Sequence, residues 1–169
     1  MKSIDPSDLS RWFDAYGAAL VLYARQWLPA ELAEDVVQEV FIRLASLWSA
    51  PDNAKAWLYR SVRNAAIDRC RSEQRRHKHE RQHAAERTHC FQGHPDELMD
   101  ADAVQSALRR LPEEQREVIV LRIWAGMTFQ EVSEVTGLAS STLFSRYEAG
   151  LTTLRQIMER PPCKIPKGN

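Results

Sequence analysis

The sequence predicts an all-helical fold of two small domains, and three features support this prediction. Glycine is sparse, with 6 in 169 residues, and no stretch shows the apolar and polar alternation of a half-buried strand. Apolar residues recur instead at steps of three and four, which places them on one face of a helix. Prolines and glycines separate these stretches. We therefore predict a three-helix bundle at residues 1–76, a flexible linker at 77–95, a helix-turn-helix bundle at 96–160 and a disordered tail at 161–169.

Three helices are expected in the first domain, at residues 7–28, 30–47 and 54–76. Pro29 separates the first two, and the segment WSAPDN at 48–53 is rich in turn-forming residues. The first helix is expected to bury one apolar row: Leu9, Phe13, Tyr16, Leu20, Tyr23 and Trp27. The second is expected to bury another: Val36, Val37, Val40, Phe41, Leu44 and Leu47.

The second domain is expected to begin with a helix that ends near Leu111 and another that has Pro112 in its first turn and runs to Trp124. Thr128 then caps a short helix, with Glu131 at the capping-box spacing. Gly137 ends that helix, and Ser140 or Ser141 is expected to cap the last one. The buried side of this last helix is predicted to hold five residues: Leu143, Tyr147, Leu151, Leu154 and Met158.

Residues 128–155 have the spacing of a helix-turn-helix, whose second helix lies in the major groove of DNA. Ser133 is small enough for the two helices to approach closely, Gly137 permits the left-handed turn, and apolar Leu138 follows it. An ordinary helical hairpin is the alternative.

The composition is that of a soluble cytoplasmic protein. No apolar run reaches the length of a membrane span, and the start, MKSIDPSDLSRW, carries acidic residues where a signal peptide is apolar. The three cysteines are an odd number without a CxxC pair, which indicates a reducing compartment. We expect no disulfide.

The net charge is zero, but the charges are segregated along the chain. Residues 5–40 hold two basic and seven acidic side chains, and residues 60–87 hold nine basic and four acidic ones. An acidic face beside a basic stripe suits one protein partner and one polyanion. On the third helix, six arginines must face solvent or an anion, and a merely solvated face is the alternative. They are Arg60, Arg63, Arg69, Arg71, Arg75 and Arg76.

Three segments in order carry a resemblance to a known family: AEDVVQEVFIRL at 33–44, AWLYRSVRNAAIDRCR at 56–71 and LPEEQREVIVLRIWAGMTFQEVSEVTG at 111–137. They are similar to the bacterial RNA polymerase sigma factors of the extracytoplasmic-function group. The resemblance implies a promoter-specificity subunit that binds the clamp and flap of core RNA polymerase and directs transcription initiation. Its region 2 would open the promoter −10 element and its region 4 would read the −35 element.

The resemblance also implies which residues of the first domain make these contacts. The polymerase-binding residues would be Asp35, Gln38, Glu39 and Phe41. The −10 residues would be Asp52, Asn53 and Lys55 in a loop that holds a flipped base, followed by Arg60, Arg63, Asn64 and Asp68. Asp68 is equally suited to hold Arg69 or Arg71 in place. Trp57 and Tyr59 are candidates for base stacking, although Trp57 also fits a core position.

In the second domain the resemblance places four residues near the −35 DNA: Ser141, Thr142, Ser145 and Arg146. The family commonly has basic residues about where Phe144, Glu148 and Ala149 stand in this chain. Since phosphate neutralisation supplies much of the affinity for DNA, we expect this domain to bind DNA weakly by itself.

Two other functions compete with a sigma factor. A stand-alone helix-turn-helix regulator would bind duplex DNA tightly without polymerase. A metal sensor would use the five histidines, all between His77 and His94, among which His79 and His83 lie one helical turn apart. We favour a solvated linker there and expect no metal and no cofactor. Without a nucleophile and base pair or a phosphate loop, we expect no enzymatic activity. A regulating anti-sigma factor is compatible with this interpretation, because the resembling group is commonly held inactive by one.

Overall fold

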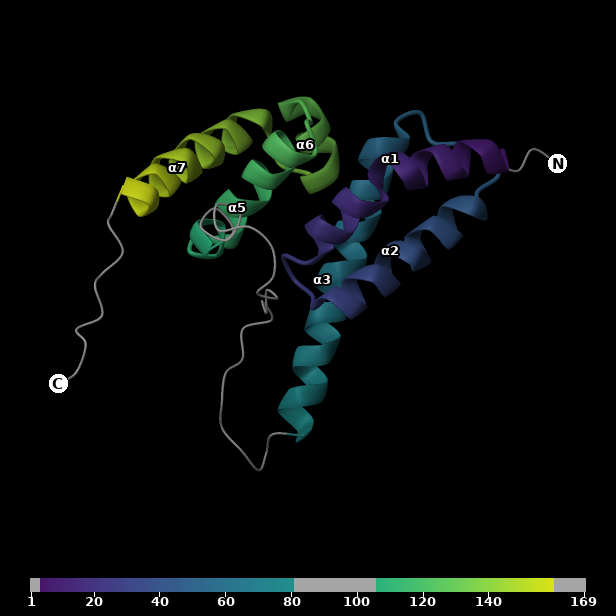
Figure 1. Cartoon of the computed structure of the whole chain (residues 1–169), viewed down its shortest axis with the longest axis horizontal. Helices are drawn as coiled ribbons and strands as arrows, with labels where there is room; N and C mark the ends of the chain where they lie inside the picture. Colours follow the sequence, from purple (N-terminus) through teal and green to yellow (C-terminus); the bar gives the residue numbers. More distant parts are fainter. Residues whose placement is uncertain (1–3, 81–105, 160–169) are drawn as a thin grey trace.

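The computed structural model describes residues 4–80 and 106–159 of the chain, and residues 77–80 by their backbone alone. Every regular element within these ranges is a helix, which confirms the all-helical prediction (Figure 1). None of the described helices is both long enough and apolar enough to cross a membrane.

The first half contains α1 (Pro6–Ala24), α2 (Ala30–Ala45) and α3 (Ala54–Glu80). Side chains that precede α1 and α3 stabilise their first turns. Asp5 Oδ1 accepts a hydrogen bond from Ser7 N at 2.8 Å, and Asn53 Oδ1 accepts one from Ala56 N at 3.0 Å. Such capping satisfies backbone donors that have no partner inside the helix.

Several details of the first half differ from the sequence prediction. Helix α2 ends at Ala45 rather than near residue 47, and α3 continues to Glu80, so it extends into the predicted linker. Helix α1 ends at Ala24 rather than near residue 28, but the turn that follows still buries Trp27 and Leu28. Phe13 was expected to be buried and is 51% exposed. Its ring packs edge-on against Phe41 at a centroid distance of 5.1 Å, so these two rings form a partly open aromatic pair beside the core.

The second half contains a helical turn at 106–109, then α5 (Glu113–Ile119), the π-helix η2 (Val120–Trp124), α6 (Phe129–Thr136) and α7 (Ser140–Glu159). Pro112 precedes α5 as its cap and is not in its first turn. The π-helix is a departure from the predicted continuous α-helix. Its wider turn leaves Ile123 and Trp124 exposed although both are apolar.

The helix-turn-helix spacing is confirmed by local geometry. Thr128 Oγ1 accepts from Glu131 N at 3.2 Å, and Glu131 Oε2 accepts from Thr128 N at 2.8 Å, which completes the capping box. Gly137 has a φ of 75°, in the left-handed region. Ser133 Oγ donates to Leu138 O at 2.6 Å across the turn.

The last helix begins one step earlier than predicted. The carbonyl of Ala139 accepts from Leu143 N, so Ser140 is already helical and the predicted serine cap is wrong. Leu143 is buried as expected. Leu151 and Met158, however, are exposed, whereas Leu154 between them packs against Leu108, Leu111 and Ile119.

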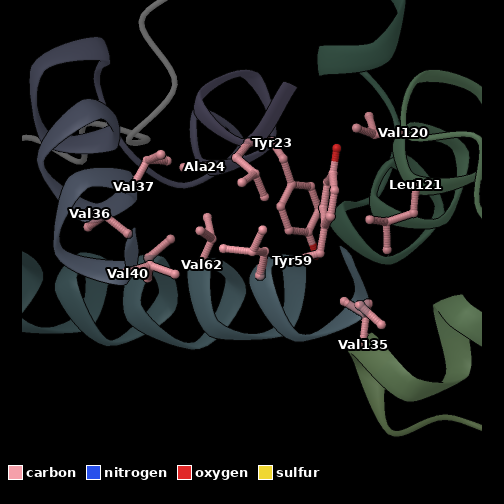
Figure 2. Packing of buried hydrophobic residues seen from close by; sticks show 14 of the residues in the cluster. Tyr23, Ala24, Val36, Val37, Val40, Tyr59, Val62, Val120, Leu121 and Val135 are labelled. Carbon is pink, nitrogen blue, oxygen red and sulfur yellow. The ribbon is translucent and has the colours of Figure 1, made fainter. Parts of the chain in front are cut away.

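The two halves pack against each other through a shared apolar core (Figure 2). Helix α3 lies against α6, and α1 contacts η2. Tyr23 and Tyr59 of the first half meet Val120, Leu121 and Val135 of the second in this core. The sequence prediction treats the halves as units joined by a flexible linker, and most of that linker (81–95) lies outside the described residues. The contact between the halves was not predicted.

Candidate functional site

The outer face of α2 is acidic and open. Asp35, Gln38 and Glu39 are exposed because the opposite face of the helix, which includes Val36 and Val40, is buried in the core. Phe41 is half-buried at the edge of the same helix. The structure therefore places the four predicted polymerase-binding residues on a single helix, three of them exposed.

The predicted −10 residues of α3 divide into two groups. Arg60, Asn64 and Asp68 are spaced four apart, so they form one exposed stripe along the helix. Arg63 lies outside this stripe and is partly covered by the second half. Among the described ion pairs, none joins Asp68 to Arg69 or Arg71, and Arg69 Nη1 instead lies 4.0 Å from Glu39 Oε1 on α2.

The loop before α3 contributes polar groups at the foot of that stripe. Asp52 is exposed, whereas Asn53 and Lys55 are half-buried beside Glu131 of α6. The backbone hydrogen bond of Thr128 lowers the pKa of Glu131 most, and Lys55 and the Asn53 side chain lower it further.

An exposed aromatic residue at the start of this loop was missed by the sequence prediction. Trp48 is 77% exposed, so its indole is a flat apolar surface in water. Its position as the first residue of the turn-forming segment at 48–53 was the available signal. Tyr59, in contrast, was a candidate for base stacking and is 1% exposed. Burial, together with the nearby Tyr16, raises the pKa of Tyr59 to about 12. That stacking prediction is wrong for the structure described.

Arg63 joins the two halves through a two-point ion pair. Its Nε donates to Glu117 Oε1 at 2.6 Å and its Nη2 donates to Glu117 Oε2 at 3.3 Å. The Arg63 side chain is 23% exposed and that of Glu117 is 5% exposed. Burial lowers the pKa of Arg63, but the hydrogen bonds and charge of Glu117 outweigh it and the net pKa is raised. The guanidinium is therefore firmly charged and already has an anionic partner.

Tyrosine and tryptophan side chains complete the contact around this ion pair. Tyr23 Oη donates to Glu117 Oε1 at 2.7 Å, and Trp27 Nε1 donates to Glu113 Oε1 at 2.6 Å. Burial first, and then the charge of Glu117, raise the pKa of Tyr23 well above its ordinary value. The sequence analysis missed Glu113 and Glu117. Their spacing of four on one helix gave a weak signal, but their partners lie far away in the chain.

The outer face of the helix-turn-helix is polar and has little positive charge. Ser141, Thr142 and Ser145 are exposed on α7, as a DNA-reading face requires. Arg146 is half-buried, and its Nη2 lies 3.0 Å from Glu114 Oε2 on α5. Phe144 is 50% exposed at this surface. The arginine that was assigned to DNA is thus partly committed to joining α5 and α7.

The predicted histidine cluster cannot be placed, because the side chains of all five histidines lie outside the described residues. Within residues 4–76 and 106–159, no group of three or more histidine, cysteine or acidic side chains is arranged to hold a metal ion. Cys70 is half-buried, and its Sγ accepts a hydrogen bond from Gln74 Nε2 at 3.5 Å.

Comparison with known families gives two matches that follow the two halves of the chain. The family described as Sigma-70 region 2 matches residues 12–76, and the family described as Sigma-70, region 4 matches residues 101–154.

Curated relatives cover most of the chain. It is 30% identical over 161 residues to the ECF RNA polymerase sigma factor SigL of Mycobacterium tuberculosis, covering 87% of this chain and 86% of that protein. It is 29% identical over 134 residues to the RNA polymerase sigma factor SigZ of Bacillus subtilis, covering 76% of this chain and 73% of that protein.

Two solved structures share the fold. One is the sigma factor RpoE in complex with the anti-sigma factor NepR from Bartonella quintana, with a TM-score of 0.70, 22% identity and coverage of 90% of this chain and 99% of that one. The other is CnrH in complex with the cytosolic domain of CnrY, with a TM-score of 0.66, 23% identity and coverage of 92% and 90%.

Proposed function

Because the chain belongs to the extracytoplasmic-function (ECF) RNA polymerase sigma factors, we propose how its surfaces divide the work of promoter recognition. The protein is a promoter-specificity subunit that binds core RNA polymerase and promoter DNA. In our proposal residues 1–76 bind the polymerase clamp and the −10 element, and residues 96–160 bind the −35 element and the flap. The protein works in the cytoplasm, as a regulatory subunit without catalytic activity of its own.

The observation that supports this division most directly is the exposed stripe on α3. Arg60 offers a guanidinium to the phosphates of a separated strand, and Asn64 offers an amide that can make two hydrogen bonds to a base edge. The loop before α3 adds Asp52, and Trp48 provides a surface on which a base can stack. This combination suits single-stranded DNA better than duplex DNA.

The acidic face of α2 is the proposed contact with the polymerase clamp. Three exposed polar side chains on one rigid helix can set the orientation of a basic partner and speed its association. The half-buried Phe41 and exposed Phe13 form an aromatic pair that adds apolar contact area.

The −35 contact is proposed to be the weaker one. Ser141, Thr142 and Ser145 can donate and accept hydrogen bonds in the major groove, but Arg146 is shared with Glu114. Few phosphates can therefore be neutralised by α7, and the affinity for duplex DNA should be low without polymerase.

An anti-sigma factor is a further proposed partner. One of the solved structures that share the fold contains a sigma factor bound to an anti-sigma factor, and another contains CnrH bound to the cytosolic domain of CnrY. Exposed apolar residues in the second half, Ile123 and Trp124 on η2 and Met158 on α7, provide area for a protein contact.

The experiment that tests this proposal combines polymerase binding with transcription. Asp35→Arg reverses a charge on the exposed face of α2, so we expect it to weaken binding to core polymerase by about tenfold or more, as interfacial charge reversals commonly do. Glu134→Arg makes the same change at an exposed position on α6, away from the acidic face of α2, and is the matched control. Binding is measured by titrating labelled protein with core enzyme, and run-off transcription on genomic fragments is measured in parallel.

Equal binding by the wild type and Asp35→Arg would count against the clamp assignment. Nanomolar binding of the purified protein to duplex DNA, with no new transcripts when it is added to core polymerase, would favour the stand-alone regulator instead.

A further inference from the structure

We propose that the two halves of the free protein close on each other through an autoinhibitory contact. In it, Glu117 of the second half occupies the place of a DNA phosphate against Arg63 of the −10 surface. The inference rests on the proposed function, because it assumes that Arg63 meets DNA. It adds that the protein carries its own competitor for the opened strand.

The ion pair of Arg63 and Glu117 has the geometry with which arginine binds a phosphate. Two nitrogens of one guanidinium meet two oxygens of one carboxylate, at 2.6 and 3.3 Å. Tyr23 donates a third hydrogen bond to the same carboxylate at 2.7 Å. The Glu117 side chain is 5% exposed, so this carboxylate is held in a built site and not on a loose surface. While the ion pair lasts, these two donors of Arg63 are not available to a strand.

A second carboxylate lies at the other end of the covered surface. Glu131 is held in place by the capping box at the start of α6, where Thr128 N donates to it at 2.8 Å. Lys55 and Asn53, both assigned to the base-holding loop, lie close enough to lower the pKa of Glu131 after the larger effect of the Thr128 backbone. The same short helix, α6, packs against α3. The second half therefore lies against α3 through α6 and holds Arg63 through Glu117.

Contact between the halves covers only part of the DNA-binding surface. The residues that stay exposed show which DNA contact is blocked. Arg60, Asn64 and Asp68 remain exposed on α3, and Ser141 and Thr142 remain exposed on α7. A strand can therefore approach α3, but it cannot reach Arg63 until the halves separate. The −35 helix stays accessible in both states.

The energetic consequence is that strand binding and closure compete. When the binding-competent state is only fractionally populated, the apparent dissociation constant rises in inverse proportion to that fraction. Polymerase can shift the equilibrium because it contacts both halves in the proposed complex, and it favours opening only by binding the open state more tightly. The free protein should therefore bind a strand poorly, and the polymerase-bound protein should bind it well.

The test measures separation of the halves and strand binding in the same set of full-length variants. For separation, Cys70, Cys90 and Cys163 are replaced by serine, and spin labels are attached to cysteines introduced at the exposed positions Glu34 on α2 and Thr152 on α7. For strand binding, the probe is a short fluorescein-labelled single-stranded DNA of random sequence, and its polarisation is measured. Glu117→Gln removes the charge but keeps the side-chain shape. Glu134→Gln removes an exposed charge on α6 and is the matched control.

We expect a narrow, short label distance in the free wild type and in Glu134→Gln, and longer distances in Glu117→Gln. Strand affinity should rise about tenfold in Glu117→Gln and stay unchanged in the control. In the distance measurement alone, Arg63→Glu should open the protein, and the double exchange Arg63→Glu with Glu117→Arg should close it again. This rescue distinguishes a specific ion pair from general destabilisation.

Identical distances and identical strand affinities in the wild type and Glu117→Gln would overturn the inference. Opening without a gain in strand affinity would also overturn it, since the contact would then not compete with DNA. The proposed function is judged separately, by crosslinking of the −10 strand to the polymerase-bound wild type. If the −10 strand crosslinks to the polymerase-bound wild type but one of the two results above is negative, only the autoinhibitory contact is refuted. If the strand does not crosslink, the −10 assignment itself is refuted.

Discussion

Buried phenol groups carry much of the contact between the halves at the scale of single residues. Tyr23 is fully buried and donates to Glu117, and its ring lies 5.3 Å from that of Tyr59. The neutral form of a tyrosine is favoured in such a site, because the tyrosinate anion would lose its hydration and be repelled by the Glu117 carboxylate. The contact therefore depends on a neutral Tyr23 hydroxyl, beside the buried phenol of Tyr59.

Stability should consequently fall in alkaline solution. The pKa of tyrosine is 10.0 when unperturbed, and it is raised to about 12 for Tyr59 and well above 10.0 for Tyr23. A raised pKa means that the folded state holds the proton more tightly, so this stability is complete below pH 10.0 and is lost as the pH rises from there towards about 12. Urea unfolding at a series of pH values measures it. The double variant Tyr23→Phe, Tyr59→Phe should lose less stability over this window than the wild type, and an equal loss would contradict the argument.

Residue environments were predictable from sequence only where one helix decides them. The exposure of Asp35, Glu39 and Arg60 follows from the apolar spacing on their own helices. The burial of Tyr59 and the pairing of Arg63 do not, because Glu117 lies 54 residues further along the chain. No local pattern contains that information.

At the scale of elements, the helix-turn-helix depends on a backbone conformation that only its turn residue supplies. Gly137 has a φ of 75°, and a Cβ built there would meet nothing within 4 Å. The turn therefore requires glycine for its backbone and not for space. Local signals of this kind were readable in the sequence, whereas the π-helix η2 was not, because periodicity analysis assumes the ordinary helical turn.

Gly137→Ala should destabilise the protein by about 1–2 kcal/mol, the cost of a left-handed conformation for a residue with a Cβ. Gly137→Asn should cost less. The matched control is Gly17→Ala within α1, where the new methyl group would lie at ordinary contact distance, 3.6 Å, from the Phe13 ring. That change should stabilise the protein by up to about 1 kcal/mol through helix propensity. Thermal unfolding of the three variants decides the matter, and a neutral Gly137→Ala would show that the turn tolerates another conformation.

At the scale of the whole molecule, the acidic surface and the basic surface differ in how much of each is exposed. The acidic face of α2 is exposed, whereas Arg63 on the basic surface of α3 is partly covered by its ion pair with Glu117 of the second half. The sequence predicted both surfaces from their charge segregation. The sequence could not predict how the halves meet. The contact joins apolar and ionic groups that are distant in the chain, and the prediction treated the two halves as separate domains.

From this arrangement we propose that α3, and not α7, supplies most of the affinity for the promoter. Arg60 is exposed and available to a strand, whereas Arg146 is half-buried and paired with Glu114. A weak upstream contact is sufficient if the opened strand is held firmly after melting. The relative importance of these two arginines is therefore the point on which the account depends.

The most direct measurement is the extent of promoter opening by polymerase that carries Arg60→Ala or Arg146→Ala, read as permanganate reactivity of unpaired thymines in the −10 element. Each variant is first shown to bind core polymerase as the wild type does. We predict that Arg60→Ala lowers the open fraction by about tenfold, equivalent to ~1.4 kcal/mol, and that Arg146→Ala lowers it several times less. An equal loss in both variants, or a larger loss in Arg146→Ala, would contradict the account.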